Sequence, residues 1–518
     1  MQAMPRKYPI GIQDFEELRN RNCVYVDKTD LIYSLVNNYA TCFLSRPRRF
    51  GKSLLCSTLK AYFQGKKDLF KGLSIESLET EWIPRKVFHI SFADSKYLEV
   101  ENLTSLLDNT LSKWESLYGS SPTERTFSLR FKGVIERAYE QSGEQVAVLI
   151  DEYDSPILSA ISAGMETRRT ELRDIMRDFF SPLKDSGVYI HFLFITGITK
   201  YRQSLIESEL NHLDNISMSE EYSSICGITE TELLTQFKPD IAALAERNHE
   251  TYDEACAHLK QLYDGYHFCE DTEEIYNPYS IIKVFKYKKY NYYWFESGTP
   301  TFLVEMVKNS SFIPETLESC EAISSLFDRP VENLTELLPV LYQSGYLTIK
   351  GYDEGIYTLG YPNDEVRHGF VNSLLPAYLG YTEEDGQMSI LAMKKALENG
   401  DAESCMKLMC SFVASVPYEA KSDKESRAEI IFYMIFTLLG QFTQTQVPTA
   451  IGRSDVVVKN KKYIYIFEIK LHGTAEGGLA QIERQHYAVP YETDNRQVVR
   501  ISVQYDAETR GITEWKIA

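Results

Sequence analysis

The stretch Gly51-Lys52-Ser53 constrains the fold most, because it stands between a short apolar run and an amphipathic segment. The preceding "YATCFLSR" suits a buried strand, and the following "KSLLCSTLKAYFQG" has apolar residues at helical spacing and ends at Gly65. A strand-to-helix junction presents free backbone N–H groups and the positive end of the helix to an anion. The stretch therefore predicts a phosphate-binding loop, in which Lys52 reaches the β and γ phosphates and the Ser53 hydroxyl ligates Mg²⁺.

The loop departs from the usual glycine-rich pattern. Arg46 occupies the position five residues before Gly51, where glycine is expected, and Pro47, Arg48 and Arg49 follow it. An arginine cannot take the positive φ that glycine allows without a cost, and proline removes a backbone N–H. We therefore expect a reshaped loop in which all three arginines belong to the cofactor-binding residues. Arg48 and Arg49 would supply charge where backbone donors are lost, or would contact another ligand.

Two acids follow a second apolar run, as a nucleotide site requires. "VAVLIDEYD" places Asp151 and Glu152 after a strand that begins at Val146, and "VYIHFLFITG" places Thr196 near the end of a further strand. Asp151 can hold the hydration shell of Mg²⁺, Glu152 can polarise the attacking water, and Thr196 can sense the γ-phosphate. The two motifs, in this order, predict a P-loop nucleotide-binding fold with ATP and Mg²⁺ as cofactors. Whether ATP is hydrolysed or only bound stays open.

Composition and charge narrow the class of protein. The net charge of −19 argues against a surface coated by nucleic acid, although a local basic cleft remains compatible with it. The nine cysteines show no CxxC or CxxH spacing, which indicates reduced thiols in a cytoplasm. The longest apolar run, "IIFYMIFTLLG", is shorter than the about 20 residues that span a bilayer. No apolar signal segment stands at the N-terminus. We expect a cytoplasmic protein that does not enter a membrane.

The middle of the chain is predicted to be helical and rich in tyrosine. The segment "ENLTELLPVLYQSGYLTIKGYDEGIYTLGYPNDEV" reads as helix, strand, turn, strand and helix start, a winged-helix-like order. Such a unit either contacts DNA or forms a lid on the nucleotide module. Asp353 and Glu354 at the tip would be repelled by phosphate, which favours the lid. His267 has no second ligand at metal spacing and is expected to be packed or capping. The basic "KVFKYKKYNYYW" is a weak candidate for phosphate contact.

The last hundred residues carry a second constellation. Asp455 opens an apolar strand, and "YIYIFEIK" is a β-branched and aromatic strand that contains Glu468 and Lys470. Residues two apart on a strand share a face, and a neighbouring strand can bring Asp455 beside them. Asp455 and Glu468 would bind Mg²⁺, and Lys470 would orient or deprotonate water for phosphodiester hydrolysis. The pattern alone is also typical of exposed charged hairpins, but both strands are too apolar for a solvated edge.

These motifs, taken together, resemble a known family. "RPRRFGKSLLCSTLKAYFQG", "VLIDEYDSPI", "GIQDFEELRNRNCVYVDKT" and "FITGITKY" resemble the bacterial AAA-ATPase-like family whose members carry a C-terminal PD-(D/E)xK nuclease domain. The order of helix, strands, helix and strand between about Glu425 and Tyr505 resembles that nuclease core. The resemblance implies that Glu429, Asp455, Glu468, Lys470 and Gln481 occupy its motif positions, with Gln481 contacting the site or the scissile phosphate.

We therefore predict an α/β protein of three parts. These are an AAA-ATPase-like P-loop domain in residues 1–220, a helical and winged-helix-like region in 221–420, and a restriction-endonuclease-like α/β domain in 421–518. The expected function is ATP-regulated, Mg²⁺-dependent nuclease activity on DNA, and a homo-oligomer is compatible with it. The alternative is a nucleotide-switched scaffold whose nuclease fold does not cut. A P-loop kinase is disfavoured, because no acceptor site is recognisable.

Overall fold

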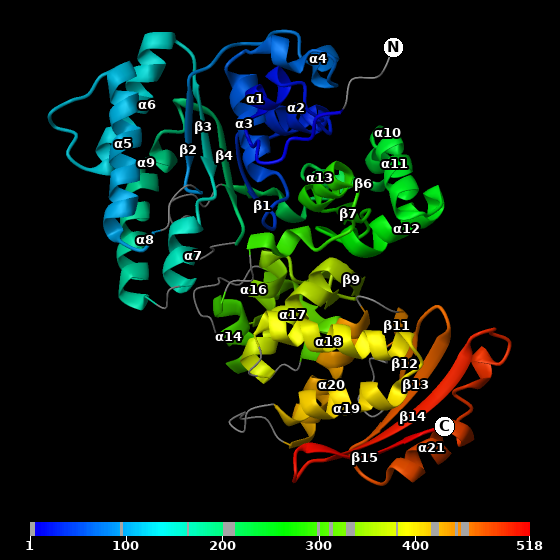
Figure 1. Ribbon diagram of the computed structural model, residues 1–518. Coiled ribbons are helices and arrows are strands. Elements are labelled where there is room, and N and C mark those ends of the chain that lie inside the picture. Colours follow the sequence, from blue (N-terminus) through cyan, green and yellow to red (C-terminus); the bar gives the residue numbers. More distant parts are fainter. Residues whose placement is uncertain are drawn as a thin grey trace. The chain divides into compact units, whose positions relative to one another are not determined.

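The structure is a computed structural model of the chain, and it divides into two compact units. The first unit holds residues 1–296 and 321–363, and the second holds residues 297–320 and 364–518. The residues described are 6–93, 97–162, 165–199, 213–297, 301–309, 314–327, 337–379, 382–415, 424–440, 444–446 and 455–518. Figure 1 shows the elements in chain order. The three-part division of the chain stays a proposal.

A parallel sheet forms the centre of the first unit. Its strands are β1 (Thr41–Ser45), β2 (Val87–Ser91), β3 (Val146–Asp151), β4 (Ile190–Gly197) and β5 (Asp214–Asn215), in the order β2-β3-β4-β1-β5. Every pairing in this sheet is parallel. The inner strand β3 is buried along its whole length, as a continuous apolar run predicts for a strand covered on both faces. Parallel strands end at one edge, so the loop after β1 and the acids after β3 meet there.

Helices cover both faces of this sheet. Phe63 of α3 packs on Phe192 at 5.3 Å, and Phe88 packs on Trp114 of α5 at 5.0 Å. Phe88 and Phe192 lie one register position apart, so their side chains point to opposite faces. The helices of this part are α1 (Phe15–Asn20), α2 (Thr29–Asn38), α3 (Lys52–Phe63), η1 (Lys67–Phe70), α4 (Ile75–Leu78), α5 (Val100–Tyr118), α6 (Phe127–Ser142), α7 (Ser155–Ser162), α8 (Glu166–Phe180) and α9 (Pro182–Asp185).

A helical cluster continues the first unit. It contains η2 (Ile216–Met218), β6 (Ile228–Thr229), α10 (Glu230–Gln236), α11 (Lys238–Asn248), α12 (Tyr252–Tyr263), β7 (Ile275–Tyr276), α13 (Pro278–Tyr287) and η3 (Tyr293–Ser297). Its core joins Leu233, Ile241, Leu259 and Val284 from successive helices. Asn277 caps α13 by accepting a hydrogen bond from Ser280 N at 3.1 Å, and Pro278 takes the first helical position.

A small sheet, in which β9 and β10 pair antiparallel, completes the first unit. Its strands are β8 (Cys320–Ile323), β9 (Thr348–Asp353) and β10 (Ile356–Gly360), in the order β8-β10-β9, and the helices α15 (Ser324–Phe327) and α16 (Leu337–Ser344) lie between β8 and β9 along the chain. The turn from α16 to β9 is tight against the phosphate-binding loop, because a Cβ on Gly345 would lie 2.6 Å from Pro47 Cβ. This packing supports the lid interpretation of the winged-helix-like segment.

The second unit builds a mixed sheet between helices. Its helices are α14 (Thr301–Asn309), η4 (Pro314–Glu318), α17 (Asp364–Leu379), α18 (Glu383–Glu398), α19 (Ala402–Ala414), α20 (Lys424–Gly440), α21 (Ala475–Arg484) and η5 (Val489–Tyr491). Its strands are β11 (Gln444–Gln446), β12 (Asp455–Lys459), β13 (Tyr463–Lys470), β14 (Gln497–Asp506) and β15 (Gly511–Ile517), in sequence order across the sheet. Only the β13–β14 pairing is parallel among the pairings described for this sheet.

The two faces of this sheet are covered by different helices. Ile464 and Ile466 of β13 pack with Ile482 of α21, whereas Phe467 packs on Phe436 of α20 at 5.0 Å. Side chains alternate along a strand, so α21 and α20 lie on opposite faces. Glu468 and Lys470 share the α21 face.

Two further observations concern the whole chain. Among the described residues, no helix is both long and apolar enough to cross a membrane. All nine cysteines are free thiols, in agreement with the predicted absence of a disulfide framework.

Candidate functional site

The predicted phosphate-binding loop joins β1 to α3. Gly51 is the residue before the helix and has φ 93°, a left-handed conformation that glycine adopts without strain. Lys52 begins α3 and is buried, and its Nζ donates to the carbonyls of Arg46 at 3.0 Å and Pro47 at 3.1 Å. Ser53 lies half-buried in the first turn of α3. The ammonium group therefore lies over the loop, close to where a phosphate would meet the N-terminus of the helix.

Arg46 is directed into the protein. Its side chain is 1% exposed, and its guanidinium donates to the carbonyls of Ser217 at 2.8 Å and Tyr222 at 3.0 Å. The group also stacks over Phe268 at 4.1 Å. Burial lowers the pKa of Arg46 to about 10. The side chain of Arg46 therefore holds the fold together, and its backbone carbonyl accepts a hydrogen bond from Lys52 Nζ.

The other two arginines of the loop also differ from each other. Arg49 donates to the Tyr293 carbonyl at 2.7 Å and stacks over Tyr279 at 4.0 Å, with φ 68°. Arg48 has an exposed side chain, while its carbonyl accepts a hydrogen bond from Trp294 Nε1 at 3.4 Å. Arg48 is therefore the loop arginine whose guanidinium is best placed for a ligand.

The strand-end acids and Thr196 come together as predicted. Asp151 is buried at the end of β3, and Thr196 Oγ1 donates to its Oδ1 at 2.7 Å. The same hydroxyl oxygen accepts from Glu152 N at 3.3 Å. Glu152 has φ 52°, and burial raises its pKa above the ordinary value against the opposing charge of Lys52. A carboxylic acid with a shifted pKa, on a turn with a strained backbone, is typical of catalytic sites.

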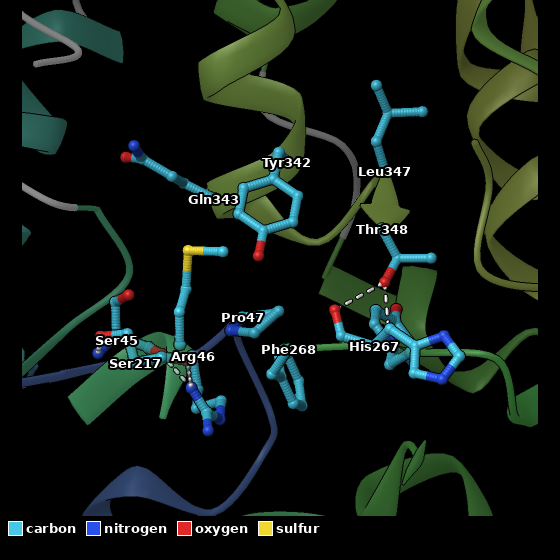
Figure 2. A pocket seen from close by; sticks show the side chains of 12 residues that line it. Ser45, Arg46, Pro47, Ser217, His267, Phe268, Tyr342, Gln343, Leu347 and Thr348 are labelled. Atoms are coloured by element: carbon cyan, nitrogen blue, oxygen red, sulfur yellow. Dashed lines mark hydrogen bonds between the residues drawn. The ribbon is translucent and has the colours of Figure 1, made fainter. Parts of the chain in front are cut away.

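A cavity lies behind the phosphate-binding loop (Figure 2). Pro47, Met218, Phe268, Tyr342 and Thr348 line it, and Figure 2 shows Pro47, Tyr342 and Phe268 around the space. Its volume of about 20 Å³ suits a water molecule, not a nucleobase. His267 beside it donates its backbone N–H to Thr348 Oγ1 at 2.8 Å, and its Nε2 lies 2.7 Å from the Thr272 carbonyl. The predicted packing role of His267 agrees with these contacts.

The C-terminal constellation also assembles. Asp455 is opposite Glu468 in the β12–β13 register, although the Asp455 side chain lies outside the described residues. Glu468 is 1% exposed, and its Oε1 lies 2.7 Å from Lys470 Nζ. Lys470 Nζ in turn donates to Gln481 Oε1 of α21 at 2.5 Å. The structure thus joins Glu468, Lys470 and Gln481 in one chain of contacts on the α21 face.

Sequence reasoning missed Ser502 and the reason for the glycine at 478. Ser502 is fully buried on β14 and stands opposite Glu468 in the register. A Cβ on Gly478 would lie 1.9 Å from Ser502 Oγ and 3.4 Å from Glu468 Cγ. The "GG" of α21 was the available signal. It marks the close approach of the helix to a strand.

Glu429 comes from a different helix than Gln481. It belongs to α20, on the opposite face, where its charge contributes to the raised pKa of the half-buried Glu315. Phe436 and Phe432 of α20 pack on Phe467 at 5.0 Å and Tyr505 at 6.0 Å, so Glu429, one turn further, lies toward the edge at which β13 ends.

The donor sets fit the predicted cofactors. Carboxylate, hydroxyl and carbonyl oxygens are the ligands that Mg²⁺ prefers. Glu468 with Asp455 offers such donors in the second unit, and Asp151 with Ser53 offers them in the first. The described residues contain no cluster of three or more His, Cys, Asp or Glu side chains that could hold a metal ion. Water and phosphate oxygens are further ligands of the kind that Mg²⁺ takes in such sites.

Comparisons with known proteins agree with both constellations. Residues 9–206 match the family model described as "Predicted AAA-ATPase", and residues 423–515 match the model described as "PD-(D/E)XK nuclease superfamily". The chain is 32% identical over 525 residues to a protein of Azotobacter chroococcum mcd 1, named "Uncharacterized protein in vnfD 5'region". That match covers 98% of each chain. No solved structure matches the chain.

Proposed function

Because the chain belongs to the predicted AAA-ATPase family and carries a PD-(D/E)XK nuclease superfamily domain, we propose that it is an ATP-binding protein with ATP-regulated, Mg²⁺-dependent nuclease activity on DNA. The observation that carries the proposal is the chain of contacts from Glu468 to Lys470 to Gln481, at 2.7 Å and 2.5 Å, opposite Asp455. We further propose a cytoplasmic location, in keeping with nine free thiols. The homo-oligomer and the domain boundaries at 220 and 420 also remain proposals.

In the nuclease half, each residue has a chemical task. Asp455 and Glu468 would hold Mg²⁺, which supplies an activated water and charge stabilisation at the phosphate when bound. Lys470 would orient or deprotonate the water, and Gln481 fixes the ammonium by accepting its hydrogen bond. The phosphodiester substrate would approach the α21 face of the sheet, where this ammonium is still partly exposed.

In the nucleotide half, Lys52 and Arg48 would neutralise the phosphates, and Ser53 and Asp151 would hold Mg²⁺. Thr196 donates to Asp151 and accepts from the Glu152 amide, which ties the γ-phosphate sensor to both acids. Glu152, left-handed and half-buried, would polarise water for hydrolysis.

Regulation by ATP is supported by the way the phosphate-binding loop is held. Arg49 bonds Tyr293, and Trp294 bonds Arg48, just before the chain passes to the second unit after residue 296. Gly345 packs on Pro47, and the β9–β10 hairpin that follows leads to the passage after residue 363. Two of the points at which the chain crosses from the first unit to the second therefore follow segments that contact the phosphate-binding loop. A packed or bonded chain of this kind is a physical route for coupling.

The alternative, a nucleotide-switched scaffold, is favoured by one observation. Glu468 is 1% exposed and already paired with Lys470, which is also the arrangement expected of a structural ion pair that never cuts. In such a scaffold the Lys470 ion pair would stabilise the fold, and the domain would bind a nucleic acid or a partner without cutting it.

The test is cleavage of mixed linear, circular and single-stranded DNA by the full chain, in Mg²⁺ or Mn²⁺, with and without ATP. The nuclease proposal expects metal-dependent cleavage that Lys470→Ala abolishes. Lys462→Ala, an exposed lysine on the β12–β13 turn, is the matched control and should cut as the wild type does. Nucleotide-dependent assembly without cleavage, unchanged in Lys470→Ala, would favour the scaffold.

A further inference from the structure

The buried carboxylate of Asp154 has a place in the structure that no motif explains. Asp154 follows the strand-end acids in the turn after β3 and is 1% exposed. Its Oδ2 accepts hydrogen bonds from Ile198 N at 3.0 Å, Thr199 N at 2.7 Å and Thr199 Oγ1 at 2.7 Å. A single carboxylate oxygen therefore holds both residues that follow β4.

Further contacts join the turn after β3 to the end of β4 and the residues that follow it. Tyr153 N donates to the Thr196 carbonyl at 3.0 Å, and Tyr153 Oη donates to the Thr199 carbonyl at 3.0 Å. A Cβ on Gly197 would lie 2.6 Å from Tyr153 Cε1 and 3.0 Å from Asp154 Oδ1, so glycine is needed for this approach. The turn after β3 and the exit of β4 thus form one bonded unit.

This unit holds a strained residue in place. Glu152 has φ 52°, a left-handed conformation that is costly for a glutamate and persists only where the surroundings enforce it. The Glu152 amide donates to Thr196 Oγ1 on one side, and the bonds of Tyr153 and Asp154 to residues 196–199 fix the turn on the other. Contacts to the end of β4 and to the residues that follow it maintain this strained conformation. Three of these contacts are hydrogen bonds that the Asp154 side chain accepts.

We propose that Asp154 is a positioning residue of the hydrolytic site. By holding Ile198 and Thr199, it keeps the Thr196 hydroxyl between the Asp151 carboxylate and the Glu152 amide, and so keeps the Glu152 carboxylate aimed at the water that attacks the terminal phosphate. The inference rests on the proposed hydrolysis of ATP, and it adds a residue that acts through others without touching the nucleotide.

The chemistry of the side chain makes the proposal specific. A carboxylate oxygen accepts several charge-assisted hydrogen bonds, whereas an alanine accepts none. An asparagine keeps one acceptor oxygen for Ile198 and Thr199. The NH₂ group of the asparagine would take the place of Oδ1 of the aspartate. That Oδ1 atom is buried and has no hydrogen-bond partner among the described residues. Asp154→Asn should therefore restore most of what Asp154→Ala loses.

The first measurement is the steady-state rate of ATP hydrolysis by the full chain. In Asp154→Ala we expect kcat to fall about 10- to 100-fold and KM to rise by a smaller factor, as misplacement of a catalytic group predicts. Asp154→Asn should recover to within about fivefold of wild type on the same basis. Asp185→Asn, an exposed aspartate on α9, is the matched control and should not change the rate. An unchanged kcat in Asp154→Ala would overturn the proposal.

Two further readouts separate positioning from a merely structural role. Hydrogen exchange of the Ile198 and Thr199 amides should quicken at least about tenfold in Asp154→Ala, while the core of β3 stays protected. The ratio of ADP to ATP dissociation constants, measured by calorimetry in Mg²⁺, should fall toward one in the same variant. Equal losses in kcat, ATP affinity and β3 protection, without rescue by Asp154→Asn, would overturn positioning. If the wild type does not turn over ATP, the proposed hydrolysis fails, and an unchanged affinity ratio in Asp154→Ala would then overturn the role of Asp154 as well.

Discussion

At the scale of single residues, the structure separates side chains that the sequence presents as equivalent. Arg46, Arg48 and Arg49 stand within four positions, yet the first is buried against carbonyls, the last stacks on Tyr279, and only Arg48 is exposed. The prediction of a reshaped loop rests on proline and the missing glycine, which act locally. The sequence pattern could not predict where Arg46 points, because the acceptors, Ser217 and Tyr222, are distant along the chain.

This separation predicts opposite outcomes for two arginine variants. Arg46→Ala leaves buried carbonyls unpaired and opens a cavity, so we expect a loss of about 3 kcal/mol in unfolding free energy. Arg48→Ala should change stability by less than about 0.5 kcal/mol, as surface changes do, but weaken ATP binding roughly tenfold by removing a charged contact. Thermal unfolding and calorimetric ATP titration measure the two effects. A stable Arg46→Ala protein would contradict the structural role of that guanidinium.

A second residue-scale prediction concerns pH. Asp264, after α12, is buried, and burial raises its pKa to about 7, with Lys260 Nζ 3.9 Å away. The other charged or titratable groups acting on it are Glu230, Glu274, Tyr276 and Lys350. Because the folded pKa exceeds the unfolded one, the stability that this group contributes is present at acid pH and is lost as pH rises through 7.

Asp264→Asn cannot ionise, so its advantage over wild type should grow with pH. We expect the difference in unfolding free energy between variant and wild type to increase by about 2 kcal/mol from pH 5 to pH 8. Denaturant titrations at the two pH values measure it. A difference that stays constant, or that grows toward acid pH, would show that Asp264 is not held near this pKa in the folded protein.

At the scale of elements, the close packing of α21 on the sheet determines whether the candidate nuclease site of the second unit can form. Lys470 reaches Gln481 only if the helix lies close to β13 and β14, and that closeness requires glycine at 478. The helix itself begins with Thr474, whose hydroxyl accepts from Gly477 N at 3.1 Å.

The two neighbouring glycines of α21 should therefore respond in opposite ways. Gly478→Ala places a methyl group against Ser502 and should cost about 2 to 3 kcal/mol by overpacking, together with the Lys470–Gln481 contact. Gly477→Ala is the matched control, because its Cβ would meet only Thr474 Oγ1 at 3.4 Å. It should stabilise the helix by up to about 1 kcal/mol. Thermal unfolding of both variants tests this, and equal shifts would contradict the packing.

Elements with strong local patterns were predictable, and weakly patterned ones were not. The strands ending at Ser45, Asp151 and Lys470 are apolar runs, and their motifs stand at strand ends where the chemistry needs them. β11, with the sequence Gln-Thr-Gln, has no apolar alternation, and β15 is a largely half-exposed edge strand, so neither was expected. Asp154 and Ser502 were missed because their importance arises from contacts between elements. The repeated acid in "DEYD" was the available signal for Asp154.

At the scale of the whole molecule, each compact unit carries one constellation. The phosphate-binding loop and the acids of β3 lie in the first, and Glu468, Lys470 and Gln481 lie in the second. The chain passes between the units after residues 296, 320 and 363. Arg49 connects the loop to Tyr293, close to the first of these passages.

Arg49→Ala should therefore weaken control of the nuclease more than it weakens the nucleotide site. The variant loses the bond to Tyr293 and the stacking on Tyr279, and we expect ATP affinity within about fivefold of wild type. The ratio of cleavage rates with and without ATP should move toward one. Arg247→Ala, exposed on α11, is the control and should keep the wild-type ratio. An unaltered ratio in Arg49→Ala would exclude this route.

The measurement that tests the central claim most directly is the initial rate of DNA cleavage by the full chain in Mg²⁺, with and without ATP, for wild type and Lys52→Ala. Nucleotide control of the Glu468–Lys470 centre predicts that ATP changes the wild-type rate at least about tenfold, whereas Lys52→Ala cuts at one rate in both conditions. A Lys52→Ala protein that still responds to ATP as the wild type does would contradict the account.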